Sequence, residues 1–194
     1  RAIGEPDVVA AVLGARGLPG GRLPVGRTAL ALLRRAGKPL VVVPPELRDA
    51  GPRHLERLLV PLEGTELSSR PVLECLCPLI AAPVEIIALH VFAAGTALPV
   101  LDRPERDLLI WAEEFRSRFC PAAARMESRS GAVGELVGEV GREESVDLVV
   151  LSWSQDASAD HAKVVRDVLS RSTVPVLLLP VLLDAPRAVH RATP

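Results

Sequence analysis

The fold is decided by the stretch from Asp147 to Pro180, DLVVLSWSQDASADHAKVVRDVLSRSTVPVLLLP. It opens with an apolar run over 148–151, of the kind that forms a strand buried on both faces of a parallel sheet. After a polar loop, apolar residues at helical spacing over 164–169 predict a helix, which Pro175 ends. A second apolar run over 176–179 follows. The stretch therefore predicts one right-handed βαβ unit.

The same pattern occurs earlier, from Asp7 to Pro44, DVVAAVLGARGLPGGRLPVGRTALALLRRAGKPLVVVP. The expected elements are a strand over 8–13, a helix over 29–36 and a strand over 40–43. A unit that recurs in this way predicts two related domains, the first of them incomplete. We therefore expect a partial unit over 1–44 and a charged linker with two prolines over 45–56. A complete domain follows over 57–180, and a tail over 181–194.

The composition of the 194 residues narrows the possible functions. A net charge of −1 offers no electrostatic argument for a nucleic-acid partner or an anionic membrane. No apolar run reaches the ~18 residues of a membrane-spanning helix, so membrane insertion is not expected. The three cysteines lack metal-ligand spacing, and we expect free buried thiols in a reducing, cytoplasmic compartment.

Between 57 and 180 the expected elements alternate throughout. Strict alternation predicts an α/β fold, with a doubly wound parallel sheet covered by helices on both faces. In the first expected helix, Pro71 suits the first turn and Pro78 predicts a kink or an early end. The strands are expected over 58–60, 84–92, 124–128, 148–151 and 176–179, and the helices over 68–81, from about 102 to 119, and around 133–140 and 164–169.

Two sequence features have both a functional and a structural interpretation. The glycines between 14 and 26 follow a strand and precede a helix, where backbone amides can approach a phosphate. A long loop also uses glycine simply to turn, and spacing alone favours that interpretation. Glu63 follows the strand over 58–60 at the edge where parallel sheets bind ligands. Without further support, Glu63 is interpreted as a solvated carboxylate in a loop.

Catalytic residues are not apparent in the sequence. We find no paired acid and base, no Ser/His/Asp order with an elbow glycine and no metal cluster. His90 lies between apolar neighbours in an expected strand and is interpreted as a core histidine with one partner. We therefore expect no catalytic residue and no metal ligand, and a protein that is not an enzyme.

Four segments, taken in order, resemble the universal stress proteins, particularly the tandem kind. They are RLLVPLEGTE, IIALHVF, VDLVVLS and VPVLLLP, over 57–66, 86–92, 146–152 and 174–180. The resemblance implies a five-stranded parallel sheet of the adenine-nucleotide alpha-hydrolase type, with strand order 3-2-1-4-5. It also implies that 6–44 is the last third of a preceding domain, comprising its fourth strand, a helix and its fifth strand.

Members of that family that bind ATP carry Gly, two residues, Gly, nine residues, Gly, then Ser or Thr after the fourth strand. In the complete domain, Ser152 and Gln155 stand at the first two glycine positions, and Ala162 and Lys163 at the closing pair. The resemblance therefore implies no nucleotide cofactor there. If a nucleotide such as ATP does bind, the family's positions for contacting it are Pro61, Glu63, Val91, Ser152 and Ser154.

The partial unit is closer to this motif. Gly14, Gly17 and Gly26 match its glycines with one residue missing between the second and third, and Arg27 replaces the Ser or Thr. Arg27 still offers a charged donor to a phosphate. However, the strands that would hold adenine and ribose are not in this sequence.

Our first hypothesis is a non-enzymatic regulatory or binding protein of the stress response that acts as a homodimer or on a protein partner. The alternative is a nucleotide-binding member with a degenerate glycine loop and weak ATP hydrolysis. A third possibility is an enzyme on the same architecture, which the fold class alone does not support.

The last strand of each unit is short, apolar and uncharged, and would invite aggregation as a free edge. In the resembled family these strands pair antiparallel, which implies a seam within this chain or across a two-fold axis. The open edge near 8–13 is then expected to recruit a second copy or further strands. The seam residues are Leu40, Val41, Val42, Val43, Val176, Leu177, Leu178 and Leu179.

Overall fold

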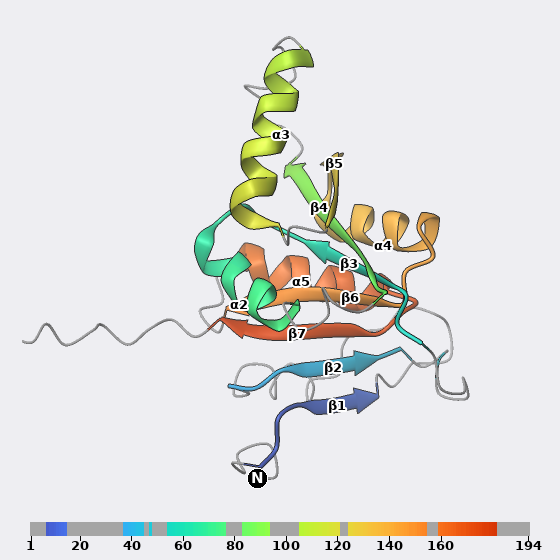
Figure 1. Cartoon of the computed structure of the whole chain (residues 1–194). Coiled ribbons are helices and arrows are strands. Elements are labelled where there is room, and N and C mark those ends of the chain that lie inside the picture. Colours follow the sequence, from blue (N-terminus) through green and yellow to red (C-terminus); the bar gives the residue numbers. More distant parts are fainter. Residues whose placement is uncertain are drawn as a thin grey trace, which may run out of the picture.

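The computed structural model describes residues 7–14, 37–44, 47, 54–76, 83–93, 105–120, 124–154 and 159–181. Figure 1 shows one sheet with β1 and β2 at one end and β5 at the other. Some predictions concern residues outside the described ranges. They are the predictions on the helix over 29–36, on Gly17, Gly26 and Arg27, on the kink at Pro78 and on the tail beyond 181. No helix in the described part is long and apolar enough to cross a membrane.

The described strands form one seven-stranded sheet in the order β1-β2-β7-β6-β3-β4-β5. Within the predicted complete domain, the five strands are parallel and lie in the order 3-2-1-4-5, which confirms the predicted fold. The full sheet is larger than that domain because two further strands extend it. The strands are β1 (Ala11–Gly14), β2 (Leu40–Val43), β3 (Arg57–Pro61), β4 (Glu85–Ala93), β5 (Arg125–Gly131), β6 (Leu148–Ser154) and β7 (Val176–Val181).

Two helices cover each face of the sheet, as expected for parallel strands with apolar residues on both faces. Alternate residues of β3 divide between the two cores: Leu59 packs under α4 and α5, whereas Leu58 and Val60 pack under α2 and α3. All three side chains are fully buried. The helices are α2 (Glu66–Leu76), α3 (Glu105–Phe119), α4 (Val133–Glu143) and α5 (Ala159–Arg171).

Helix α2 begins earlier than the sequence predicts, and Pro71 therefore lies in its interior rather than in its first turn. The cause is Thr65, which precedes the helix and caps it. Its hydroxyl oxygen accepts the Ser68 N–H at 3.3 Å, and its carbonyl accepts the Ser69 N–H at 3.0 Å. The interior proline leaves one helical carbonyl without its usual donor.

Strand β2 pairs antiparallel with β7 within the chain, in the place where the sequence analysis expects the seam. Val41 lies opposite Leu177, and the pairs on either side are Leu40 with Leu178 and Val42 with Val176. Leu40 and Val42 are buried in the core that α4 and α5 cover. The pairing thereby joins β1 and β2 to the other five strands in one continuous sheet.

A local two-fold axis relates the two halves of this seam. Each last strand follows a proline, and the two proline carbonyls accept equivalent bonds, from Ala11 N–H to Pro39 and from Val149 N–H to Pro175, both at 3.0 Å. The central pair of the seam, Val41 opposite Leu177, consists of the second residue after each of these two prolines. The β1–β2 pair is therefore structurally equivalent to the β6–β7 pair, with Ala11 corresponding to Val149.

His90 lies on β4 in a cluster of aromatic rings beneath α3. Its ring centroid is 4.6 Å from those of Phe92 and Phe115 and 5.3 Å from that of Trp111. Its Nδ1–H donates to the carbonyl oxygen of Leu62 at 2.9 Å. Burial lowers the pKa of His90, partly offset by this bond. The residue is a half-buried core histidine with one hydrogen-bond partner, as predicted.

We predict that Val42→Lys destabilises the whole fold, because it places a charge in the buried seam. The expected loss is about 3 kcal/mol in the free energy of unfolding, measured by chemical denaturation. Val12→Lys on neighbouring β1 is the matched control, since Val12 is 68% exposed. It should change the free energy by less than about 0.5 kcal/mol. Equal stability of V42K and V12K would show that the seam does not hold the sheet together.

We predict that His90 makes the fold less stable in mild acid. Its pKa in the folded state lies below the value of about 6.5 expected in the unfolded chain. As the pH falls below about 6.5, the unfolded chain takes up a proton that the folded protein resists, and stability declines. His90→Gln should therefore lose less stability between pH 7.5 and 5.5 than the wild type, by denaturant titration. Exposed His54→Gln is the control, and a wild-type pH dependence in H90Q would contradict the assignment.

Candidate functional site

A cavity of about 70 Å³ lies where β3, β4 and β6 end. β3 and β6 are neighbours whose connections run to opposite sides of the sheet, and ligands bind at such a switch point in open α/β sheets. The first residue of α4 and two residues of α5 complete the wall. The lining residues are Pro61, Leu62, Glu63, Leu89, Val91, Val133, Leu151, Ser152, Val164 and Val165.

The structure brings four of the sequence-predicted nucleotide contacts to this cavity: Pro61, Glu63, Val91 and Ser152. Ser154 ends β6, and the placement of its side chain lies outside the described part of the structure. Gly14 ends β1, at the position equivalent to Ser152, away from the cavity. The remaining candidates, Gly17, Gly26 and Arg27, are outside the described residues.

The sequence analysis missed the apolar wall, to which Leu62, Leu89, Leu151, Val133, Val164 and Val165 contribute. One signal for it was available: Leu89 and Val91 are two apart in a strand and therefore share a face. The two lining side chains from α5 carry no signal that separates them from ordinary core residues. The cavity is mainly apolar, with Glu63 and Ser152 as its polar lining residues.

The turn that carries Glu63 is fixed on both sides. The Leu62 N–H donates to Leu89 O at 2.8 Å, and the Leu62 carbonyl accepts the bond from His90. Gly64 has φ +84°, and a Cβ there would lie 2.6 Å from Phe115 Cε2. Any other residue would be strained at this position, both by the backbone and by the Phe115 ring. The turn therefore holds the exposed Glu63 at the mouth of the cavity.

The connection from β6 to α5 is too short to follow the family's glycine motif. Residues 155–158 alone join Ser154 to Ala159, where the helix begins. Ala162 and Lys163, which align with the closing glycine and hydroxyl of the motif, lie inside α5 instead of at its start. At the first glycine position the Ser152 residue is only 8% exposed. The local structure thus differs from a phosphate-wrapping loop at both of its ends.

The described residues around the cavity offer little catalytic chemistry. Glu63 is the one ionisable residue among those that line it. His90 points to the opposite core, whereas its neighbours Leu89 and Val91 line the cavity. Within the described residues, no group of three His, Cys, Asp or Glu side chains could hold a metal ion.

Neither described cysteine is poised to act as a nucleophile. Burial raises the pKa of the Cys75 thiol. It also raises that of Cys120, to about 11, and the charge of Arg116 only partly offsets the effect. Both thiols are free and stay protonated at neutral pH, as structural cysteines do.

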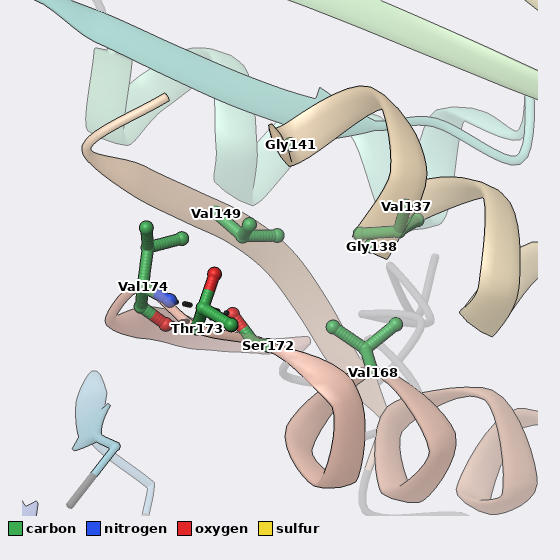
Figure 2. Close-up of a pocket in the computed structure, with 8 residues that line it drawn as sticks. All are labelled: Val137, Gly138, Gly141, Val149, Val168, Ser172, Thr173 and Val174. Carbon is green, nitrogen blue, oxygen red and sulfur yellow. Dashed lines mark hydrogen bonds between the residues drawn. The ribbon is translucent and has the colours of Figure 1, made fainter. Parts of the chain in front are cut away.

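A second cavity, of about 10 Å³, lies between α4, α5 and the start of β6 (Figure 2). Its volume is about that needed by a single water molecule. The Ser172 hydroxyl on its wall donates to the Val174 carbonyl at 2.6 Å and accepts the Val174 N–H at 3.3 Å. Because these polar groups are already paired with each other, we interpret the cavity as a packing gap.

No family model matches the sequence, and no curated protein matches it. Several solved structures do match this chain. One is a universal stress protein from Archaeoglobus fulgidus, 14% identical, with a TM-score of 0.58 over 89% of this chain and 61% of that chain. Another is a protein from Pseudomonas aeruginosa whose description also names the universal stress proteins, 14% identical, with a TM-score of 0.61 over 89% and 63%.

A third match is a universal stress protein in complex with cAMP, 18% identical, with a TM-score of 0.50 over 66% of this chain and 99% of that chain. This chain thus spans nearly all of the third structure but only about three fifths of each of the first two. The strand order of the sheet over 57–181 and the matches to solved structures support the same assignment of the fold. The chain has the fold of the universal stress proteins.

Proposed function

We propose that the chain is a universal-stress-protein-like binding and regulatory protein whose complete domain does not hold ATP. The observation that carries this proposal is the early start of α5 at Ala159. An ATP site of this family needs a loop long enough to wrap the phosphates and a hydroxyl at the helix start. Here Ala162 and Lys163 are already helical, so the loop is shorter than the motif and the motif's closing positions do not stand at the helix start.

The shape and chemistry of the cavity support the same proposal. Its volume of about 70 Å³ has room for a few water molecules. Its wall is apolar except at Glu63 and Ser152, and a carboxylate at the mouth disfavours a polyanion. Among the described lining residues Glu63 alone is ionisable, which suits the site to holding a small group rather than to acid–base chemistry. We therefore propose a protein that acts by binding, as a dimer or on a protein partner.

We also propose that 57–180 is the complete domain, that 45–56 is a linker and that 1–44 is the end of a preceding domain. The support for this division is the local two-fold axis at the seam, which makes β1–β2 equivalent to β6–β7. Equivalence of register and of the proline-carbonyl bonds is expected of a duplicated unit.

We predict that the whole chain binds Mg-ATP with a Kd no tighter than about 1 mM, or roughly −4 kcal/mol. Calorimetric titration measures this, and phosphate release tests hydrolysis in the same samples. Weak or absent heat is expected, because the β6–α5 connection is shorter than the family's phosphate-binding motif. A micromolar Kd for ATP, or phosphate release above the buffer rate, would contradict the proposal.

A second candidate function is the binding of a nucleotide with a single phosphate group. Two observations favour it: Pro61, Glu63, Val91 and Ser152 converge on one cavity, and one matching structure is a complex with cAMP. A cyclic monophosphate does not need a triphosphate-wrapping loop. The same titration with cAMP tests this candidate. Ser152→Phe, which fills the cavity, should abolish any binding, whereas Lys163→Ala on the exposed side of α5 should leave it unchanged.

A further inference from the structure

The two edges of the sheet differ in chemistry. The β5 edge carries Arg125, Glu127 and Arg129 at alternate positions; Arg125 Nη1 is 3.8 Å from Glu127 Oε2, and Arg129 also pairs with Glu127. Such charges protect an edge strand from pairing with other chains. The β1 edge instead exposes apolar side chains: Val9 is 84% exposed and Val12 is 68% exposed. In the described part of the chain, β1 is therefore the unprotected edge (Figure 1).

The local two-fold axis identifies what covers the equivalent surface in the other half. Ala11 corresponds to Val149, so Val12 corresponds to Val150. Their cross-strand partners correspond as well, since Val12 lies beside Val41 and Val150 lies beside Leu177. Yet Val150 is 0% exposed. The same position is thus fully covered in one half of the seam and open in the other.

Two elements account for the burial of Val150. Strand β3 lies beside β6 in parallel, with Leu59 opposite Val149. Helix α2, which follows β3, lies over the same face and packs Val72 and Leu76 into the core that contains Val150. The half that contains β1 has no described counterpart of either element. Within the described residues, the β1 side therefore has no equivalent of one strand followed by one amphipathic helix.

The backbone of β1 is oriented for such an addition. In a parallel pair, successive residues direct their N–H and C=O groups alternately to the two neighbouring strands. The Ala11 N–H bonds to Pro39 O at the entry to β2, so the groups of Val12 point to the outer edge. A strand laid there extends the sheet by ordinary ladder bonds, the mode called β-augmentation.

We propose that the β1 edge and the exposed face around Val12 bind a strand–helix segment. This segment is a short apolar strand that adds parallel to β1, followed by an amphipathic helix that covers Val12 and Val41 as α2 covers Val150. The proposal rests on the proposed incomplete first domain and is independent of any ligand in the cavity. A second copy that paired β1 with β1 would also satisfy the backbone edge and is the competing occupant of this surface.

The test uses the chain's own strand–helix segment as the probe. A fluorescent peptide of residues 57–76, RLLVPLEGTELSSRPVLECL, which spans β3 and α2, is titrated with the whole chain and followed by anisotropy. We expect saturable binding and slower hydrogen exchange of the Val12 amide. Val12→Lys should weaken binding at least tenfold. Leu109→Lys, at an apolar residue of α3 that is 71% exposed, is the matched control and should bind as the wild type does.

Three outcomes would overturn the proposal: no saturable binding of the peptide, equal weakening by V12K and L109K, or unchanged binding in V12K. Sedimentation of the chain alone addresses the competing occupant. Self-association that V12K abolishes would assign the edge to a second copy instead. Because the peptide assay contains no nucleotide, its failure is distinct from a failure of the Mg-ATP prediction.

Discussion

The antiparallel pairing of β2 with β7 is the constraint on which the rest of the structure depends. Two parallel strands cannot bury both of their faces alone, so β1 and β2 need the larger sheet to be stable. In return, β7 changes from an edge strand to an interior strand. The pairing buries Leu40, Val42, Val176 and Leu178 together in one core. The seam thus supports β1 and β2 and also covers the edge that β7 would otherwise expose.

The sequence predicted most of this fold because most of its strands contain continuous apolar runs. Two elements were incompletely predicted, for different reasons. The start of α2 depends on the Thr65 cap, a local hydrogen bond that competes with the proline signal six residues later. The full length of β5 (Arg125–Gly131) depends on pairing with β4 along its whole length, and its polar sequence has no apolar period to reveal this.

The site was predictable where the chemistry is polar and the chain position is defined by a strand end. Glu63 was identified in this way and Ser152 by its position in the motif of the resembled family, and the structure places both on one cavity. The apolar wall was not predictable, because Val164 and Val165 have the same spacing whether they face a core or a cavity. The early start of α5 at Ala159 was also missed, since residues 155–158 have no apolar pattern that fixes the helix boundary.

The symmetric register of the seam has a consequence for how the chain behaves at different concentrations. Val41 faces Leu177 in the same way whether β2 comes from the same chain or from another, so the contact itself does not choose between them. The choice is made by the tether over 44–56, which holds β2 near β7 at an effective concentration of roughly millimolar. Exchange between copies competes only when the protein approaches that concentration. Dilution therefore leaves the seam intact, as it would not in an assembly of separate chains.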